Sequence, residues 1–124
     1  MVEQRFCKAK VWGFESSLRL IKIKHMEVKD FQNKIIEYDD KWDRKRKSVP
    51  NEQTVFNHLV EEVGELARQY VNREMRKDQY DEKEIEDAIG DMLVLLVRLA
   101  DLRGLDIEEV ISNVIKEGEK RLGE

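Results

Sequence analysis

The chain has 124 residues, of which 40% are charged and 40% hydrophobic, with a formal net charge of −4. This balance is typical of one globular domain and excludes a disordered chain, while the longest apolar run, at residues 92–97, is too short to span a bilayer. The single cysteine, Cys7, excludes an internal disulfide, so we expect a cytoplasmic protein with no membrane partner.

The first 25 residues differ in pattern from the rest of the chain. Residues 18–24, LRLIKIK, alternate partly as a β-strand does, but the sequence offers this strand no partner. Met26 directly precedes the first predicted helix and is an alternative start site. We therefore predict a peripheral N-terminal arm at 1–25, with partner binding as its hypothesised role, and a helical domain at 26–124.

Two helices are predicted after the arm. The first begins near Val28, because its apolar residues recur at helical spacing. Pro50 lies in the following break, and Asn51 is a suitable N-cap for a second helix that runs to about Arg76. The residues predicted to enter the core are Phe31, Ile35, Tyr38 and Trp42 from the first helix and Phe56, Leu59, Val63, Leu66 and Tyr70 from the second.

Two further helices are predicted in the last third of the chain. Asp81 with Glu84 has the spacing of a capping pair for a third helix that ends near Gly104, and Asp106 with Glu109 repeats it for a fourth. The core residues expected from the fourth helix are Ile107, Val110, Ile111, Val114 and Ile115. Four helices with short connections predict an all-α fold, an antiparallel four-helix bundle.

The second helix carries acidic residues beside its apolar stripe. At 100° per residue, Glu62 lies about 80° from the centre of the stripe, at the boundary between core and water. His58 and Glu65 lie about 120° and about 140° away on the same side, so the three residues form one ridge. Glu61 points almost directly away from the stripe but lies one turn from Glu65, within reach of a shared ligand.

The third helix carries a second acidic ridge, formed by Glu84, Asp87 and Asp91 at i, i+3 and i+7. Asp91 directly precedes the apolar run at 92–97, which we expect to be deeply buried. A carboxylate at the mouth of a core is unfavourable unless it is paired or binds a cation. If the second and third helices pack antiparallel, the ridges face each other, and their oxygens suit Mg²⁺ or Mn²⁺.

Ion pairing is the alternative interpretation of both ridges, and the pattern alone leaves the two open. The alternative pairs are Glu62 or Glu65 with Arg68 or Arg73, and Asp87 or Asp91 with Arg98.

A basic segment at 41–48, KWDRKRKS, has three interpretations: a solvated loop, a loop that faces phosphate, or a nucleic-acid patch. The net charge of −4 gives no general attraction to nucleic acid, so we do not expect a nucleic-acid partner.

Two segments together resemble the MazG-like family of all-α nucleoside triphosphate pyrophosphohydrolases. These are EEVGEL at 61–66 and, about twenty residues later, DAIGDMLVLL at 87–96; the family motif is EExxE on one helix and ExxD on the next. The resemblance covers roughly residues 28–121. It implies Mg²⁺-dependent hydrolysis of an NTP or dNTP between the α and β phosphates by a homodimer or homotetramer. The products are a nucleoside monophosphate and pyrophosphate.

The resemblance also implies roles for individual residues. Carried over by position, Glu62, Glu65 and Asp91 are metal ligands, and Glu61 positions or activates the attacking water. Trp42 is implied to stack on a base, with core packing as the alternative. The candidates for phosphate contacts are Asn113, Lys116, Lys120 and Arg121, with a solvent-exposed face as the alternative.

The sequence departs from the family pattern at two positions. The glutamate of ExxD falls at Ala88, which cannot bind a metal, and Gly118 replaces an asparagine found in many relatives. Asp87 is the predicted substitute ligand, because it lies on the same helix face as Asp91, about 40° away. The alternative function is a non-catalytic MazG-like helical module for binding or regulation.

Overall fold

The computed structural model describes residues 26–123, which form four long helices and one short 3₁₀ turn. In chain order these are α2 (Val28–Arg46), α3 (Glu52–Met75), η1 (Lys77–Gln79), α4 (Glu82–Leu102) and α5 (Ile107–Leu122). This part of the chain contains no strand, and none of its helices is both long and apolar enough to cross a bilayer. The predicted all-α fold is confirmed. The predicted arm at 1–25 lies outside the described residues.

Side-chain caps confirm three of the predicted helix starts. The Asn51 side chain accepts a hydrogen bond from the backbone N–H of Thr54 at 2.9 Å, at the start of α3. Asp81 and Asp106 cap α4 and α5 in a similar way, each accepting from the N–H two residues further on at 2.9 Å. Each cap satisfies an N–H group that the first helical turn leaves without a partner.

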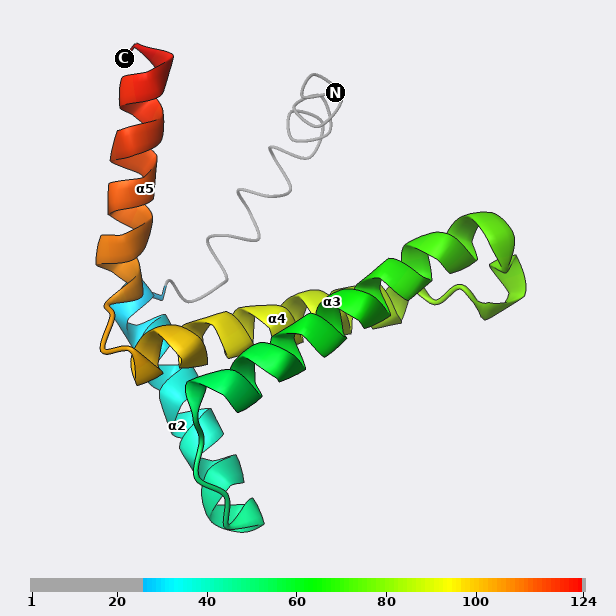
Figure 1. Ribbon diagram of the computed structural model, residues 1–124, viewed down its shortest axis with the longest axis horizontal. Helices are drawn as coiled ribbons and strands as arrows, with labels where there is room; N and C mark the ends of the chain where they lie inside the picture. The colour runs from blue at the N-terminus through cyan, green and yellow to red at the C-terminus, as the bar shows by residue number, and fades with distance from the viewer. Residues whose placement is uncertain (1–25, 124) are drawn as a thin grey trace.

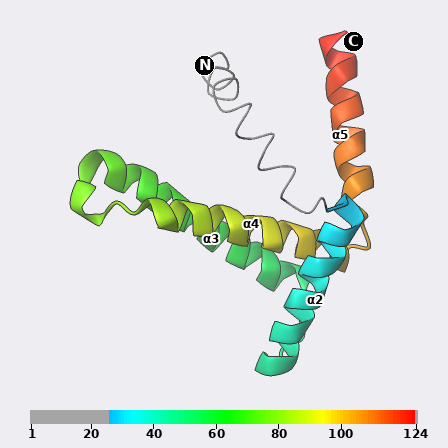
Figure 2. The ribbon, with the colours of Figure 1, turned by 180° about the vertical axis from the view of Figure 1, so that it is seen from behind.

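The helices form an open arrangement around one hairpin. α3 and α4 lie side by side and run antiparallel, joined by η1 (Figure 1). α2 crosses the hairpin against α4, as the view from behind shows (Figure 2). α5 starts beside α2 and projects away from the hairpin, so within one chain it covers little of the other helices.

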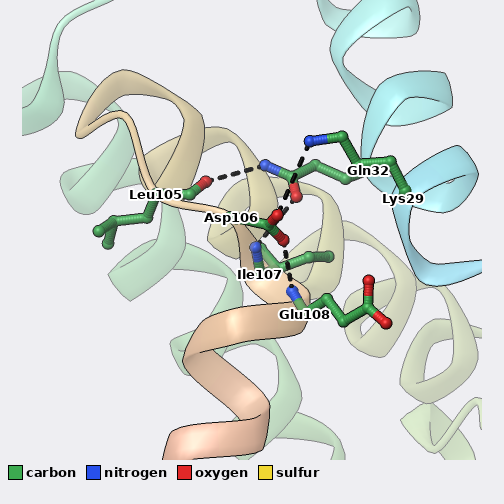
Figure 3. A network of polar contacts seen from close by, with 6 residues as sticks. All are labelled: Lys29, Gln32, Leu105, Asp106, Ile107 and Glu108. Atoms are coloured by element: carbon green, nitrogen blue, oxygen red, sulfur yellow. Dashed lines mark hydrogen bonds and ion pairs between the residues drawn. The ribbon is translucent and has the colours of Figure 1, made fainter.

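The buried amide of Gln32 fastens the start of α5 to α2 (Figure 3). Its nitrogen donates to the carbonyl oxygen of Leu105, and its oxygen accepts from the N–H of Ile107, both at 3.0 Å. An exposed ion pair between Lys29 and Asp106, at 3.8 Å, lies beside it. One side chain therefore satisfies two backbone groups of the loop that sets the direction of α5.

We expect Gln32→Ala to lower the free energy of unfolding by about 1–3 kcal/mol, because it leaves two partly buried backbone groups without partners. Hydrogen exchange at the amide of Ile107 should also become faster. Lys29→Ala is the matched control, since an exposed ion pair contributes about 0–1 kcal/mol. Equal effects of the two substitutions, measured by denaturant unfolding, would contradict the role given to Gln32.

The buried face of α3 is not the predicted apolar stripe. Val55, Glu62 and Asn72 are the buried residues of this helix, each at most 8% exposed. The predicted core residues that remain 46–49% exposed are Phe56, Val63 and Tyr70. The prediction is wrong for these three because α4 packs against a neighbouring, more polar face. Glu62, which was expected at the boundary, lies inside that contact.

In α2, likewise, Ile35 alone of the predicted stripe is buried, and Gln32 and Asp39 are buried in place of its other members. The predicted core residues of α2 that are exposed are Phe31, Tyr38 and Trp42.

Much of the apolar surface of α4 and α5 is also uncovered in the single chain. Leu95 and Val97 are buried, whereas Leu93 and Leu96 are 49% and 48% exposed, so the apolar run of α4 is only partly covered within the single chain. On α5, Ile107 is half-buried. The exposed members of its predicted core set are Val110, Ile111, Val114 and Ile115. Burial of this set within one chain was a wrong prediction, because α5 points away from the hairpin.

Candidate active site

Glu62 is a buried acid on the face of α3 that meets α4. Burial raises the pKa of its carboxyl above the ordinary value, and the negative charges of Glu65 and Asp91 raise it further. Nε2 of His58 lies 3.4 Å from Oε1 of Glu62 and opposes this rise. The structure therefore brings Glu62 and Glu65 from one acidic ridge and Asp91 from the other within electrostatic range of one another.

The chemistry of these three side chains fits a divalent cation. Carboxylate oxygens are the ligands that Mg²⁺ prefers, and a cation would relieve the repulsion at the buried Glu62. Among residues 26–123, no three Asp, Glu, His or Cys side chains already lie close enough together to hold a metal. Glu65 and Asp91 are exposed, so their side chains have room to rotate toward Glu62.

Asp87, the predicted substitute ligand, lies apart from this cluster. Its Oδ1 is 2.6 Å from Nζ of Lys83, one turn earlier on α4, and its side chain is 53% exposed. Ala88, at the motif position, is 4% exposed and faces inward. The inward position of the motif is thus filled by a methyl group, and one of the two carboxylate oxygens of Asp87 is engaged by Lys83.

The other predicted site residues lie outside the acidic cluster. Glu61 is exposed on α3, as its position on the helix predicted. Lys116, Lys120 and Arg121 are exposed on α5. Because α5 projects away, one chain does not bring these cations to its own acidic cluster (Figure 1).

A cavity of about 350 Å³ lies between α2, the loop at 47–51 and the hairpin. His58 and Asp91 line it, so it adjoins the acidic cluster. Its volume is at the lower end of the range for small-molecule sites. The lining residues that carry charge or an indole ring are Asp39, Trp42, Asp43, Arg46, Asp91 and Arg98.

Trp42 and part of the basic segment share one wall of this cavity. Arg46 Cζ lies 4.7 Å from the centre of the Trp42 ring, and Lys45 Nζ lies 5.3 Å from it. Arg46 and Ser48 line the cavity beside Trp42. A guanidinium over an indole suits a ligand that has both a flat ring and a phosphate. The prediction of a loop is wrong for residues 41–46, which form the end of α2. Their arrangement still favours the interpretation in which the segment at 41–48 faces phosphate.

Arg98 forms a buried ion cluster with two acids of α2. Its Nη1 lies 3.2 Å from Oδ2 of Asp39, and its Nη2 contacts Oδ2 of Asp43. The alternative in which Arg98 pairs with Asp87 or Asp91 is wrong, because α2 crosses α4 at this point and supplies closer carboxylates. Burial raises the pKa of the Asp39 carboxyl above its ordinary value, and the positive charge of Arg98 opposes that rise.

Asp39 and Asp43 are not among the site residues predicted from the sequence, although the sequence contains a signal for them. Together with Gln32 and Ile35 they are spaced i, i+3, i+7 and i+11, which places all four on one face of α2. That face meets α4 and the start of α5. Because three of the four residues are polar, apolar periodicity does not indicate this face.

Comparisons with known proteins agree with this fold. Residues 50–122 match the family described as the MazG nucleotide pyrophosphohydrolase domain. The structure is similar to the crystal structure of the Bacillus-conserved MazG protein, a nucleotide pyrophosphohydrolase. The TM-score is 0.59 and the identity 26%, over 77% of this chain and 92% of that chain.

A sequence relative is YpjD, an uncharacterized protein of Bacillus subtilis (strain 168), which is 40% identical over 60 residues. The match covers 46% of this chain and 54% of YpjD, so it spans about half of that protein. The family match covers more than half of the present chain, from the start of α3 to the end of α5. The chain therefore belongs to the MazG nucleotide pyrophosphohydrolase domain family.

Proposed function

We propose that this protein is a Mg²⁺-dependent nucleoside triphosphate pyrophosphohydrolase, with Mn²⁺ as an alternative metal. It hydrolyses an NTP or dNTP between the α and β phosphates and releases a nucleoside monophosphate and pyrophosphate. Membership of the family supports the class of reaction. The observation that carries the proposal is the buried Glu62, within electrostatic range of Glu65 and Asp91, beside a cavity large enough for a nucleoside.

Each acid has a proposed part in this reaction. Glu62, Glu65 and Asp91, with Asp87, are the proposed metal ligands. When bound, the cation supplies positive charge that offsets the charge developing on the phosphoryl group. Packing between α3 and α4 restrains Glu62 to few rotamers, which favours a fixed position for the phosphates. Glu61, one turn from Glu65, is proposed to orient the attacking water and accept its proton.

The cavity and α5 are the proposed nucleotide-binding parts. Trp42 is proposed to stack on the base, while Arg46 moves from the indole to a phosphate. Lys116, Lys120 and Arg121 are proposed to contact phosphates from α5. Since α5 points away from the hairpin of its own chain, these three contacts depend on a second copy of the chain.

We propose a homodimer or homotetramer for this reason and because the hairpin exposes much apolar surface. Monomeric proteins rarely leave such continuous apolar faces in water. The exposed apolar residues of α3 and α4 include Phe56, Val60, Val63, Ile89, Leu93 and Leu96. Light scattering should give a mass of at least two chains, and a monomeric mass at working concentration would overturn this part of the proposal.

The test of the function is incubation of the purified protein with each of the eight common NTPs and dNTPs, in Mg²⁺ and in Mn²⁺. We expect pyrophosphate and the matching monophosphate in equal amounts. If pyrophosphate is absent with all eight in both metals, the proposal is wrong.

A non-catalytic binding or regulatory module is the second candidate, because Ala88 removes a motif ligand. It predicts nucleotide binding without turnover. In such a module Ala88→Glu should raise metal affinity. In an enzyme that uses Asp87, the same substitution should leave metal affinity and turnover unchanged or lower them, because Ala88 is buried.

We expect Asp87→Asn to raise the Mg²⁺ concentration needed for half-maximal turnover by about tenfold or more, because it removes one anionic ligand. Loss of the exposed ion pair with Lys83 should itself change stability little, because solvent screens it. Glu86→Gln is the control, since this adjacent side chain is exposed and outside the proposed site. Identical Mg²⁺ titrations for the two variants would exclude Asp87 as a ligand.

A further inference from the structure

The lining of the cavity includes two carboxylates, and one of their oxygens is buried without a hydrogen bond. Asp39 and Asp43 both line the cavity, and they share Arg98 as an ion partner. Asp39 is 9% exposed, and its buried Oδ2 makes no hydrogen bond although it lies 3.2 Å from Arg98. With two carboxylates and one guanidinium, the cluster has a net charge of −1 when all three groups are ionised.

A purely structural pair would not need Asp39. Asp43 alone already accepts hydrogen bonds from Arg98 and from Ser48. These two bonds connect α2 to α4 and to the loop that follows α2. Adding a second, desolvated carboxylate is unfavourable unless a donor reaches it. The raised pKa of the Asp39 carboxyl agrees with this cost, since it reflects burial that Arg98 does not fully offset.

The cluster is also well placed to read a base. Asp39 lies one helical turn before Trp42, and both line the same cavity. His58 and Asp91, next to the acidic cluster, also line it. A nucleotide whose phosphates lie at Asp91 and whose base lies at Trp42 would place that base in the cavity that the Asp39 and Asp43 carboxylates line.

We propose that Asp39 and Asp43 make this cavity selective for nucleobases with an exocyclic amino group, and above all for cytosine over uracil. This inference rests on the proposed function, whose substrate class it narrows. The amino group at C4 of cytosine offers two N–H donors to carboxylate oxygens. Uracil and thymine place a carbonyl oxygen at the same position. This oxygen cannot donate to the carboxylate oxygens, which then lack a hydrogen bond in a desolvated site.

The experiment measures binding to the full chain, so that it does not depend on turnover. The probes are the α,β-methylene analogues of CTP and UTP, titrated calorimetrically in Mg²⁺. We expect the wild type to bind the cytidine analogue about tenfold more tightly, which corresponds to about 1.4 kcal/mol, because a mismatch leaves a buried acceptor without its donor. In Asp39→Asn the preference should fall to about threefold or less, since an amide can donate to the uracil oxygen.

Asp40→Asn is the matched control. Asp40 is the next residue along α2, it is exposed, and it does not line the cavity, so this variant should keep the wild-type preference. Equal affinity of the wild type for the two analogues would overturn the inference, even if Asp39→Asn does not fold. If Asp39→Asn lowers the affinity for both analogues by the same factor, Asp39 has a structural role, and the inference is also overturned.

The outcomes separate this inference from the proposed function. Selective binding of the cytidine analogue without pyrophosphate release from any nucleotide would refute the proposed reaction and support base selection. Pyrophosphate release from all eight nucleotides with equal kcat/KM, together with equal analogue affinities, would support the reaction and refute base selection.

Discussion

Glu62→Gln should lower kcat/KM for pyrophosphate release by on the order of a hundredfold or more, because it removes a buried anionic ligand from the proposed metal site. The same substitution should raise the Tm of the protein in EDTA. Without a cation, the buried carboxylate is desolvated and repelled by Glu65 and Asp91, and a neutral amide removes both penalties.

The matched control is Glu74→Gln, on the same helix, whose side chain is 72% exposed. It should leave both turnover and Tm unchanged. The Tm gain of the wild type on addition of Mg²⁺ should be largely lost in Glu62→Gln and kept in Glu74→Gln. A Glu62→Gln protein that is less stable than the wild type in EDTA, and still active, would show that Glu62 is a structural residue.

Arg98→Met should destabilise the protein by about 3–5 kcal/mol, because it leaves two largely buried carboxylates without their cation. Arg98 and Asp39 side chains are each 12% exposed, so solvent screens this pair weakly. Arg103→Met is the control, since its ion pair with Glu52 has side chains 59% and 48% exposed. The control should lose about 1 kcal/mol or less. Denaturant unfolding at one protein concentration measures both, and equal losses would contradict the prediction.

The destabilisation by Arg98→Met should depend on pH. The folded-state pKa of Asp39 is raised above the ordinary value of 3.8, so the folded protein binds this proton more tightly than the unfolded chain. The contribution of Asp39 to stability therefore falls as pH rises from about 3.8 through its folded-state pKa. Removing Arg98 raises that pKa further and widens the window. The difference in unfolding free energy should be larger at pH 7 than at pH 4.

The helices were predictable because their signals are local. The caps at Asn51, Asp81 and Asp106 act on backbone groups two or three residues away, and helical periodicity depends on neighbours within one turn. The same holds for the acidic ridges, which are sets of residues one turn apart on a single helix. The pairing of His58 with Glu62, at i and i+4, is local in this sense too.

The buried faces were not predictable in the same way. In α3 the most apolar face, with Phe56 and Val63, remains exposed, while the face with Glu62 packs within the chain. Which face is covered depends on the partner helix, and α4 and α5 offer more apolar surface than one chain can bury. The sequence therefore indicated which residues form apolar surface on each helix. It did not indicate which part of that surface is covered within the single chain.

An all-α chain of the MazG family, the starts of three helices and the two acidic ridges could all be predicted from the amino-acid sequence. The contacts of Asp87 with Lys83 and of Arg98 with Asp39 and Asp43, and the cavity that Trp42 and Asp91 both line, became known from the folded chain alone. The difference arises from distance along the chain. Arg98 and Asp43 are 55 residues apart, and no local pattern specifies which of several acids a crossing helix will bring to an arginine.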